Sequence, residues 1–187
     1  MMKKLIVIYL FIISGVMVAQ DYPALYKGLI YKMPIDAAKK EFKQHKDLYV
    51  DISFGNGVEW RLYTQNFGVV NDSLTSLVLK PKGALLGLTH EAAKVYLNNS
   101  FEFFTKRGYQ VIKEPQFWNV PIYFDATNKF GLVMHNPDKT VVVELRSVQL
   151  TGTSYLVNLG ISNYDAFLRF LTNDEAAVNN QQNQTGF

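Results

Sequence analysis

A ten-residue pattern that occurs twice constrains the fold of this chain more than any other sequence feature. It runs over residues 33–42 and again over residues 88–97. Both copies place a helix-starting residue, Pro34 or Thr89, ahead of an acid, two alanines, a lysine and an apolar stripe. Strand-like sequence with a tryptophan follows each copy, Trp60 in the first case. The repetition predicts two tandem units, each a helix followed by a β-meander.

The expected fold is therefore α+β, with an antiparallel sheet and the helices packed on one of its faces. An aromatic content of 14% suits strands better than a helical bundle. We expect one domain over residues 20–172, made of units at about 25–82 and 83–172. Residues 173–187 are polar and rich in Asn and Gln, which predicts a disordered tail.

Residues 1–19 have the pattern of a secretory signal peptide. Lys3 and Lys4 precede an apolar run from Leu5 to Ile13, and small residues lead to an expected cleavage after Ala19. The apolar run is short for a membrane span. The pattern predicts export to the periplasm or the medium, with no membrane anchor after cleavage.

Charge and cysteine content narrow the expected partners. Two of the 19 basic residues lie in the signal segment, so the rest of the chain is nearly neutral against 16 acidic residues. This balance gives no electrostatic reason to expect nucleic acid as a partner. The chain has no cysteine, which excludes disulfides and a lipoprotein anchor.

Three helices are predicted from apolar spacing. The second, over 89–107, ends at Gly108, and a short third helix over 163–171 has Ser162 as its expected cap. The first helix, over 34–45, has an expected inward face of Ile35, Ala38, Phe42 and His45.

The segment around Gly55–Gly57 predicts a hairpin whose register follows from its alternation. A three-residue loop keeps both faces consistent, with Gly57 in a left-handed conformation. The expected cross-strand pairs are Phe54–Val58, Ile52–Trp60 and Val50–Leu62, with an exposed ion pair Asp51–Arg61. The other strands are expected at 67–70, 74–79, 109–113, 118–124, 130–135, 139–150 and 154–161.

Few residues point to catalysis, and none to a cofactor. The chain has no catalytic cysteine, nucleophile elbow or phosphate-binding glycine loop. His45, His90 and His135 are scattered, so we expect no metal site. Glu114 and Asp125 flank the Trp118 strand and are the best candidates for an acid pair assembled in space.

An aromatic cluster offers the best candidate binding surface. It consists of Phe117, Trp118 and Tyr123, together with Trp60 of the hairpin. The leading functional hypothesis is a noncatalytic exported module that binds a protein or cell-envelope partner through an aromatic sheet face. The alternatives are an exported hydrolase that uses the acid pair and a carrier of a small apolar ligand.

The two repeated stretches, with the Gly57–Trp60 and Trp118 strands, give the chain a weak resemblance to a known fold. It resembles the tandem α/β fold of β-lactamase inhibitor proteins and of small outer-membrane-assembly lipoproteins. The resemblance implies an architecture over roughly residues 25–160 and a protein-binding sheet face, and it implies no functional residues. This chain departs from those families because it lacks their disulfides or anchoring cysteine, and because each unit has one predicted helix instead of two.

Overall fold

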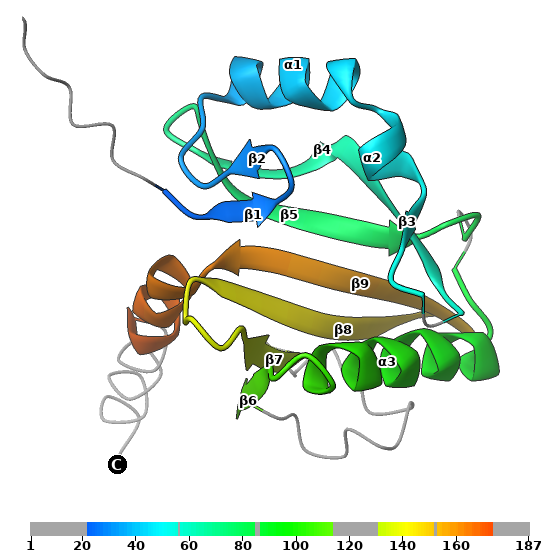
Figure 1. Cartoon of the computed structure of the whole chain (residues 1–187). Coiled ribbons are helices and arrows are strands. Elements are labelled where there is room, and N and C mark those ends of the chain that lie inside the picture. Colours follow the sequence, from blue (N-terminus) through cyan, green and yellow to red (C-terminus); the bar gives the residue numbers. More distant parts are fainter. Residues whose placement is uncertain (1–21, 56, 85–86, 114–130, 152, 174–187) are drawn as a thin grey trace, which may run out of the picture.

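The computed structural model describes residues 22–55, 57–84, 87–113, 131–151 and 153–173. The fold is α+β, as predicted, with an antiparallel sheet of seven strands and helices that pack against it (Figure 1). The first half of the chain contributes β1 (Ala24–Tyr26), β2 (Leu29–Ile30), α1 (Ile35–Gln44), α2 (Asp47–Val50), β3 (Ile52–Ser53), β4 (Glu59–Val70) and β5 (Ser73–Pro81). The second half contributes α3 (His90–Thr105), β6 (Gln110–Lys113), β7 (Leu132–His135), β8 (Val141–Thr151), β9 (Ser154–Asn163) and a helix over residues 164–173.

The last strands of the two halves meet at the middle of the sheet. The strand order is β3-β4-β5-β9-β8-β7-β6, and β1 with β2 forms a separate two-stranded sheet. β5 and β9 are antiparallel and pair from Ser76–Ser162 to Leu79–Leu159. The strands of the first half therefore run from one edge of the sheet to its middle, and those of the second half run from the middle to the other edge. The two halves join through β5 and β9.

A row of five leucines crosses the sheet and forms the centre of the core. The row contains Leu62, Leu79, Leu159, Leu145 and Leu132, which face one another in register on β4, β5, β9, β8 and β7. All five side chains are fully buried. Since alternate residues of a strand point to opposite faces, this row defines the inner face of the sheet.

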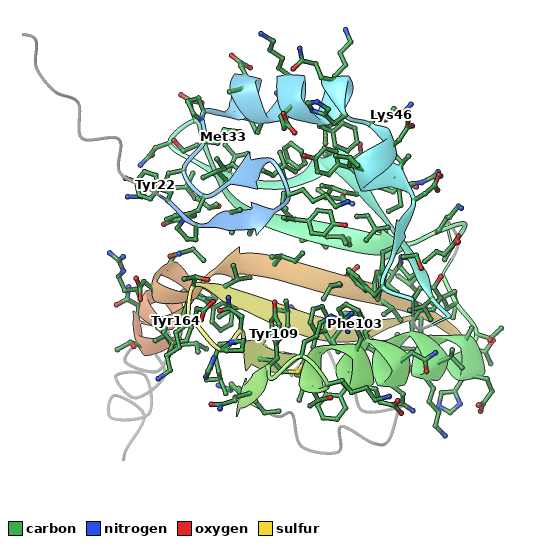
Figure 2. The ribbon with its side chains drawn as sticks, in the orientation of Figure 1. Tyr22, Met33, Lys46, Phe103, Tyr109 and Tyr164 are labelled. Atoms are coloured by element: carbon green, nitrogen blue, oxygen red, sulfur yellow. The ribbon has the colours of Figure 1, made fainter. Side chains whose placement is uncertain are left out.

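The helices cover this inner face. α3 packs on β8 and β9 and places Ala93, Leu97 and Phe104 in the core. α1 packs on β4 and β5, where the rings of Phe42 and Phe67 meet edge to face at 6.0 Å. Figure 2 shows side chains filling the space between the helices and the sheet. The two helices that begin with the repeated sequence pattern, α1 and α3, thus share one core.

Several local predictions are confirmed. α3 begins after Thr89, whose hydroxyl accepts a hydrogen bond from the Ala92 N–H. Gly57 has a left-handed backbone (φ +81°). Ile52 pairs with Trp60 in the hairpin, as its alternation requires. The Asp51–Arg61 ion pair forms, with 3.4 Å between Oδ1 and Nη2.

The hairpin is shorter than predicted, because β3 contains two residues. Val50, expected to pair with Leu62, instead ends α2, and its carbonyl accepts a hydrogen bond from Arg61 Nε at 2.9 Å. Phe54, expected to pair with Val58, stacks on Phe103 of α3 with ring centroids 4.6 Å apart. Packing against distant elements thus overrides the strand pattern at both ends of the hairpin.

Two helix details also differ from expectation. His45 does not face inward: 52% of its side chain is exposed, and it contacts Glu41 at 3.0 Å. The cap of the helix over residues 164–173 is Asn163, whose Oδ1 accepts from the Ala166 N–H at 3.0 Å, and not Ser162, which lies inside β9. The predicted signal segment, the 118–124 strand and nearly all of the predicted tail lie outside the described residues.

The leucine row predicts the effect of a truncation. We expect Leu159→Ala to lower the free energy of unfolding by about 2–5 kcal/mol, because the substitution opens a cavity at the centre of the sheet. Urea denaturation of the full chain measures the change. Leu150→Ala is the matched control, since this leucine of β8 is 45% exposed and its truncation should cost less than about 0.5 kcal/mol. Equal losses in both variants would contradict the proposed role of the row.

Candidate functional site

The candidate site is a cleft at the fork where β5 and β9 separate. Their pairing ends at Leu79–Leu159. Beyond this point β9 takes another partner, because Leu88 and Tyr155 exchange backbone hydrogen bonds of 2.7 and 2.8 Å. Pro81 lies in the part of β5 that does not pair with β9, and it has no N–H to donate. The sequence of β5 thus ends the ladder and leaves a gap between the two strands.

A bulge in β4 supplies one wall of the cleft. Leu62 pairs with Leu79 and Phe67 pairs with Leu77, so residues 63–66 together lie opposite Val78 alone. An insertion of this kind bends a strand and re-aims its side chains. Tyr63, Gln65 and Asn66 line the cleft as a result.

The loop before α3 supplies the opposite wall. Gly87 has φ +91°, and a Cβ at this position would lie 2.3 Å from Ser154 Oγ and 3.2 Å from the Tyr155 carbonyl oxygen. Only glycine fits both the backbone conformation and the close approach to β9. This contact places Ala84 and Leu88 against the open end of the fork.

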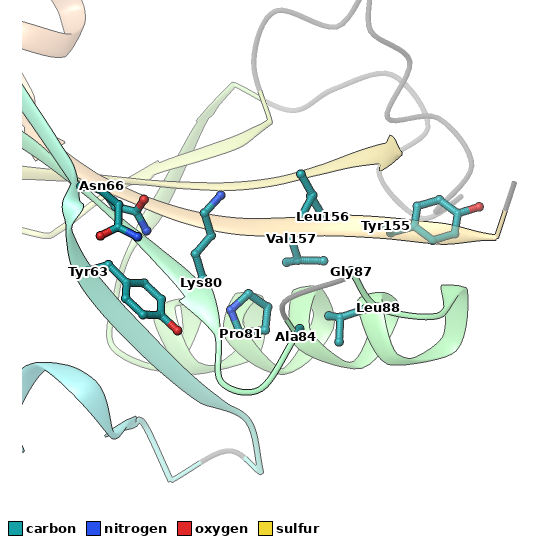
Figure 3. A pocket seen from close by; sticks show the side chains of 11 residues that line it. Tyr63, Asn66, Lys80, Pro81, Ala84, Gly87, Leu88, Tyr155, Leu156 and Val157 are labelled. Atoms are coloured by element: carbon teal, nitrogen blue, oxygen red, sulfur yellow. The ribbon is translucent and has the colours of Figure 1, made fainter. Parts of the chain in front are cut away.

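The cleft has a volume of about 220 Å³ and two chemically different sides (Figure 3). The polar lining residues are Tyr63, Gln65, Asn66 and Lys80. The largely apolar remainder consists of Pro81, Ala84, Gly87, Leu88, Tyr155, Leu156 and Val157.

Lys80 is the charged residue of this described lining. Its Nζ donates a hydrogen bond to Asn158 Oδ1 at 2.5 Å, across the gap between β5 and β9. Burial lowers the pKa of the Lys80 ammonium, because removal from water disfavours the charged form. No ion pair found among the described residues includes Lys80.

The neighbouring charges on this edge are arranged differently. Lys82 Nζ lies 3.0 Å from Asp51 and 2.8 Å from Glu59. The hydrogen bond from Lys82 is the main cause of the lowered pKa of Asp51. Arg61, which pairs with Lys80 in the ladder, is held by Asp51 and by the Val50 carbonyl. The exposed charges at this end of the sheet are therefore matched, while the partner of Lys80 among the described residues is the Asn158 amide.

Two further cavities lie near the hairpin. One of about 450 Å³, between α2 and the β4 bulge, shares Tyr63 and Gln65 with the cleft. The other, of about 360 Å³, lies beside Phe54 and Phe103, where the Arg107 guanidinium stacks 3.5 Å above the Phe103 ring. Polar surface outweighs apolar surface in both, whereas the cleft is mainly apolar.

The sequence-predicted site residues do not form this cleft. Phe117, Trp118 and Tyr123 lie outside the described residues, as does the predicted acid pair. Trp60 is fully buried, with the Tyr96 ring edge to face at 5.1 Å, so it belongs to the core and not to an exposed aromatic surface. The cause is its register, which points Trp60 to the same side as Leu62.

Sequence reasoning missed the cleft because it ended the predicted strand at residue 79 and left Lys80 and Pro81 outside it. Both are the last two residues of β5, where half-exposed Lys80 alternates with buried Leu79 and Pro81. A proline inside a strand signals an edge that cannot pair. Pro81 was therefore the local sequence signal that the pairing of β5 with β9 ends here.

Other features of the described chain are negative. None of its helices is both long and apolar enough to cross a membrane. Within the same residues, no three His, Asp or Glu side chains gather in a way that would hold a metal ion. Comparisons with protein-family models, curated proteins and solved structures gave no match to this chain.

The fit of Gly87 against β9 predicts a measurable cost. We expect Gly87→Ala to lower the free energy of unfolding by more than about 1 kcal/mol, since it adds a clash with Ser154 to the strain of a positive φ. Gly83→Ala is the control on the same loop, because Gly83 has φ +80° and open space around its missing Cβ. Urea denaturation compares the two variants. Equal costs would show that the loop is not held tightly against β9.

Proposed function

We propose that this protein is a noncatalytic binding protein whose site is the cleft at the β5–β9 fork. The observation that carries the proposal is the two-sided lining of the cleft, with Lys80 and amide side chains on one side and apolar residues on the other. Such a lining fixes the orientation of a ligand by its polar group and gains affinity from its apolar part. A volume of about 220 Å³ suits a small ligand.

The described lining favours binding over hydrolysis. Acid-pair hydrolysis needs two carboxyl groups that flank the reacting bond. The described residues of the cleft include no carboxylate, and Lys80 is hydrogen-bonded to an amide that neither accepts nor supplies a proton readily. The cleft also lacks a nucleophile beside a base among these residues. A small-ligand carrier therefore has more support than a hydrolase.

A protein or cell-envelope partner stays a prediction. The exposed large apolar side chains in the described chain are mainly aliphatic, and Phe170 is the aromatic one among them. These residues are scattered over several elements, which is normal for a protein surface. The small-ligand cleft is the better supported site.

We propose that the protein acts after export, on the strength of the signal-like pattern in residues 1–19. When the full chain is expressed in a bacterial host, the mature form should leave the cytoplasm and begin at Gln20. Cell fractionation and N-terminal sequencing of the purified protein measure this outcome. A cytoplasmic product that still begins at Met1 would contradict it.

We also propose that the two halves come from one duplicated unit. Pro34, immediately before α1, bridges to Ser73 at the start of β5, and Leu88, two residues before α3, bridges to Tyr155 near the start of β9. The same connection thus occurs once in each half, next to the two copies of the sequence pattern. The proposal requires that one rotation about an axis between β5 and β9 carry α1 onto α3 and β4 onto β8.

The cleft predicts a binding experiment. Phenylacetate, phenylacetamide, octanoate and octanamide are small amphipathic probes, and we expect at least one of them to shift the backbone NMR signals of Gly87, Leu88 and Leu156 at about 1 mM. Ala84→Phe should abolish the shifts, because its ring fills the cleft. Ala37→Phe, on the exposed face of α1, should leave them unchanged. Shifts that persist in Ala84→Phe, or the absence of shifts with all four probes, would refute the proposed site.

A further inference from the structure

We propose that the ligand of the cleft carries a carboxylate that binds Lys80, while its apolar part lies over Pro81, Ala84 and Leu88. This inference rests on the proposed function and names the chemical class of the ligand. It is carried by the position of Lys80, by the charges around it and by the shape of the cleft.

The Lys80 ammonium has unused hydrogen-bonding capacity. A lysine ammonium can donate three hydrogen bonds, and among the described residues Lys80 Nζ donates one, to Asn158 Oδ1 at 2.5 Å. Its head lies within the cleft lining, where contact with water is reduced. A half-buried cation with no counter-ion among the described residues is unfavourable, and an anionic ligand group would relieve this cost.

Two other cations lie in the same cross-strand row as Lys80. Arg61 lies directly opposite Lys80 in the ladder, and Arg146 lies opposite Asn158 on β8. These four residues form one row across β4, β5, β9 and β8, with three cations and one amide. Like charges that face each other across strands repel, and Arg61 is paired with Asp51.

The amide side chains of the β4 bulge extend the polar end. Figure 3 shows Asn66 and Lys80 on one side of the cleft and Pro81, Ala84 and Leu88 on the other. An Asn or Gln amide supplies two N–H donors that suit a carboxylate oxygen. One lysine with amide donors matches a single negative charge, whereas phosphate sites usually draw on arginine forks or several backbone N–H groups.

The size of the cleft limits the rest of the ligand. Its volume of about 220 Å³ lies below the range of about 300–1,000 Å³ for sites that take drug-sized molecules. The apolar side has room for a single ring or a short alkyl chain. The expected ligand class is therefore a small monocarboxylic acid with an apolar body.

The test compares each acid with its uncharged amide, which has nearly the same shape. NMR titrations of the full chain should give a dissociation constant at least about tenfold lower for phenylacetate than for phenylacetamide, and likewise for octanoate against octanamide. Lys80→Met should remove this preference, so that an acid and its amide bind this variant with dissociation constants within about twofold of each other, because methionine keeps the apolar stem and lacks the charge. Lys80→Arg should retain the preference. Lys39→Met, which removes an exposed lysine from α1, should change neither.

The outcomes separate the two proposals. If the wild-type chain binds an acid and its amide equally well, or if Lys80→Met keeps the preference for the acid, the inference falls and the small-ligand site stands. If neither member of either pair shifts the signals of the cleft residues, both proposals fall. Should Lys80→Met fail to fold, the comparison in the wild-type chain and the Lys80→Arg variant still decide the outcome.

Discussion

Four backbone pairs between β5 and β9 make one sheet out of two halves. They run from Ser76–Ser162 to Leu79–Leu159, and the buried row of leucines crosses the sheet at their end. Each strand of a sheet needs a neighbour for its N–H and C=O groups and a cover for its apolar face. The short β5–β9 contact satisfies both needs at once, since the row of leucines there passes beneath helices from both halves. The placement of α1 and α3 depends on it.

The cleft follows from the way this contact ends. Pro81 cannot donate to the ladder, so β5 loses its hold on β9 after Leu79. The exposed edge of β9 is then satisfied by Leu88, and Gly87 allows the loop to approach closely enough. β9 thus pairs first with β5 and then with the loop at Leu88. A gap remains where the pairing changes from β5 to this loop, and the β4 bulge lines only one side of the gap.

The sequence predicted those features whose signals are local. The cap of α3 at Thr89, the left-handed Gly57 and the Ile52–Trp60 pair each depend on a few neighbouring residues. Val50 and Phe54 were misplaced because their positions depend on distant contacts, Phe54 with Phe103 almost fifty residues later. Ser162 was misassigned because pairing with β8 extends β9 as far as Asn163.

The site was harder to predict than the fold for the same reason. The correct hairpin register already put Trp60 on the side of Leu62, and this should have placed it in the core. The cleft, in contrast, needs three segments that are distant in sequence: the β4 bulge, the end of β5 with the loop that leads to α3, and the start of β9. No spacing within one segment reports such a meeting.

Lys80 and Lys82 lie in different environments, although both are lysines near the end of the same strand. They lie two residues apart, and Lys82 forms exposed ion pairs with Asp51 and Glu59, which are ordinary stabilising contacts of modest strength. Lys80 lies half-buried with an amide partner, and its burial works against its charge. A β-branched residue would suit this strand position better by propensity alone. The hydrogen bond to Asn158 offsets part of the cost of burying this charge, and the proposed carboxylate ligand would offset more of it by supplying a counter-charge.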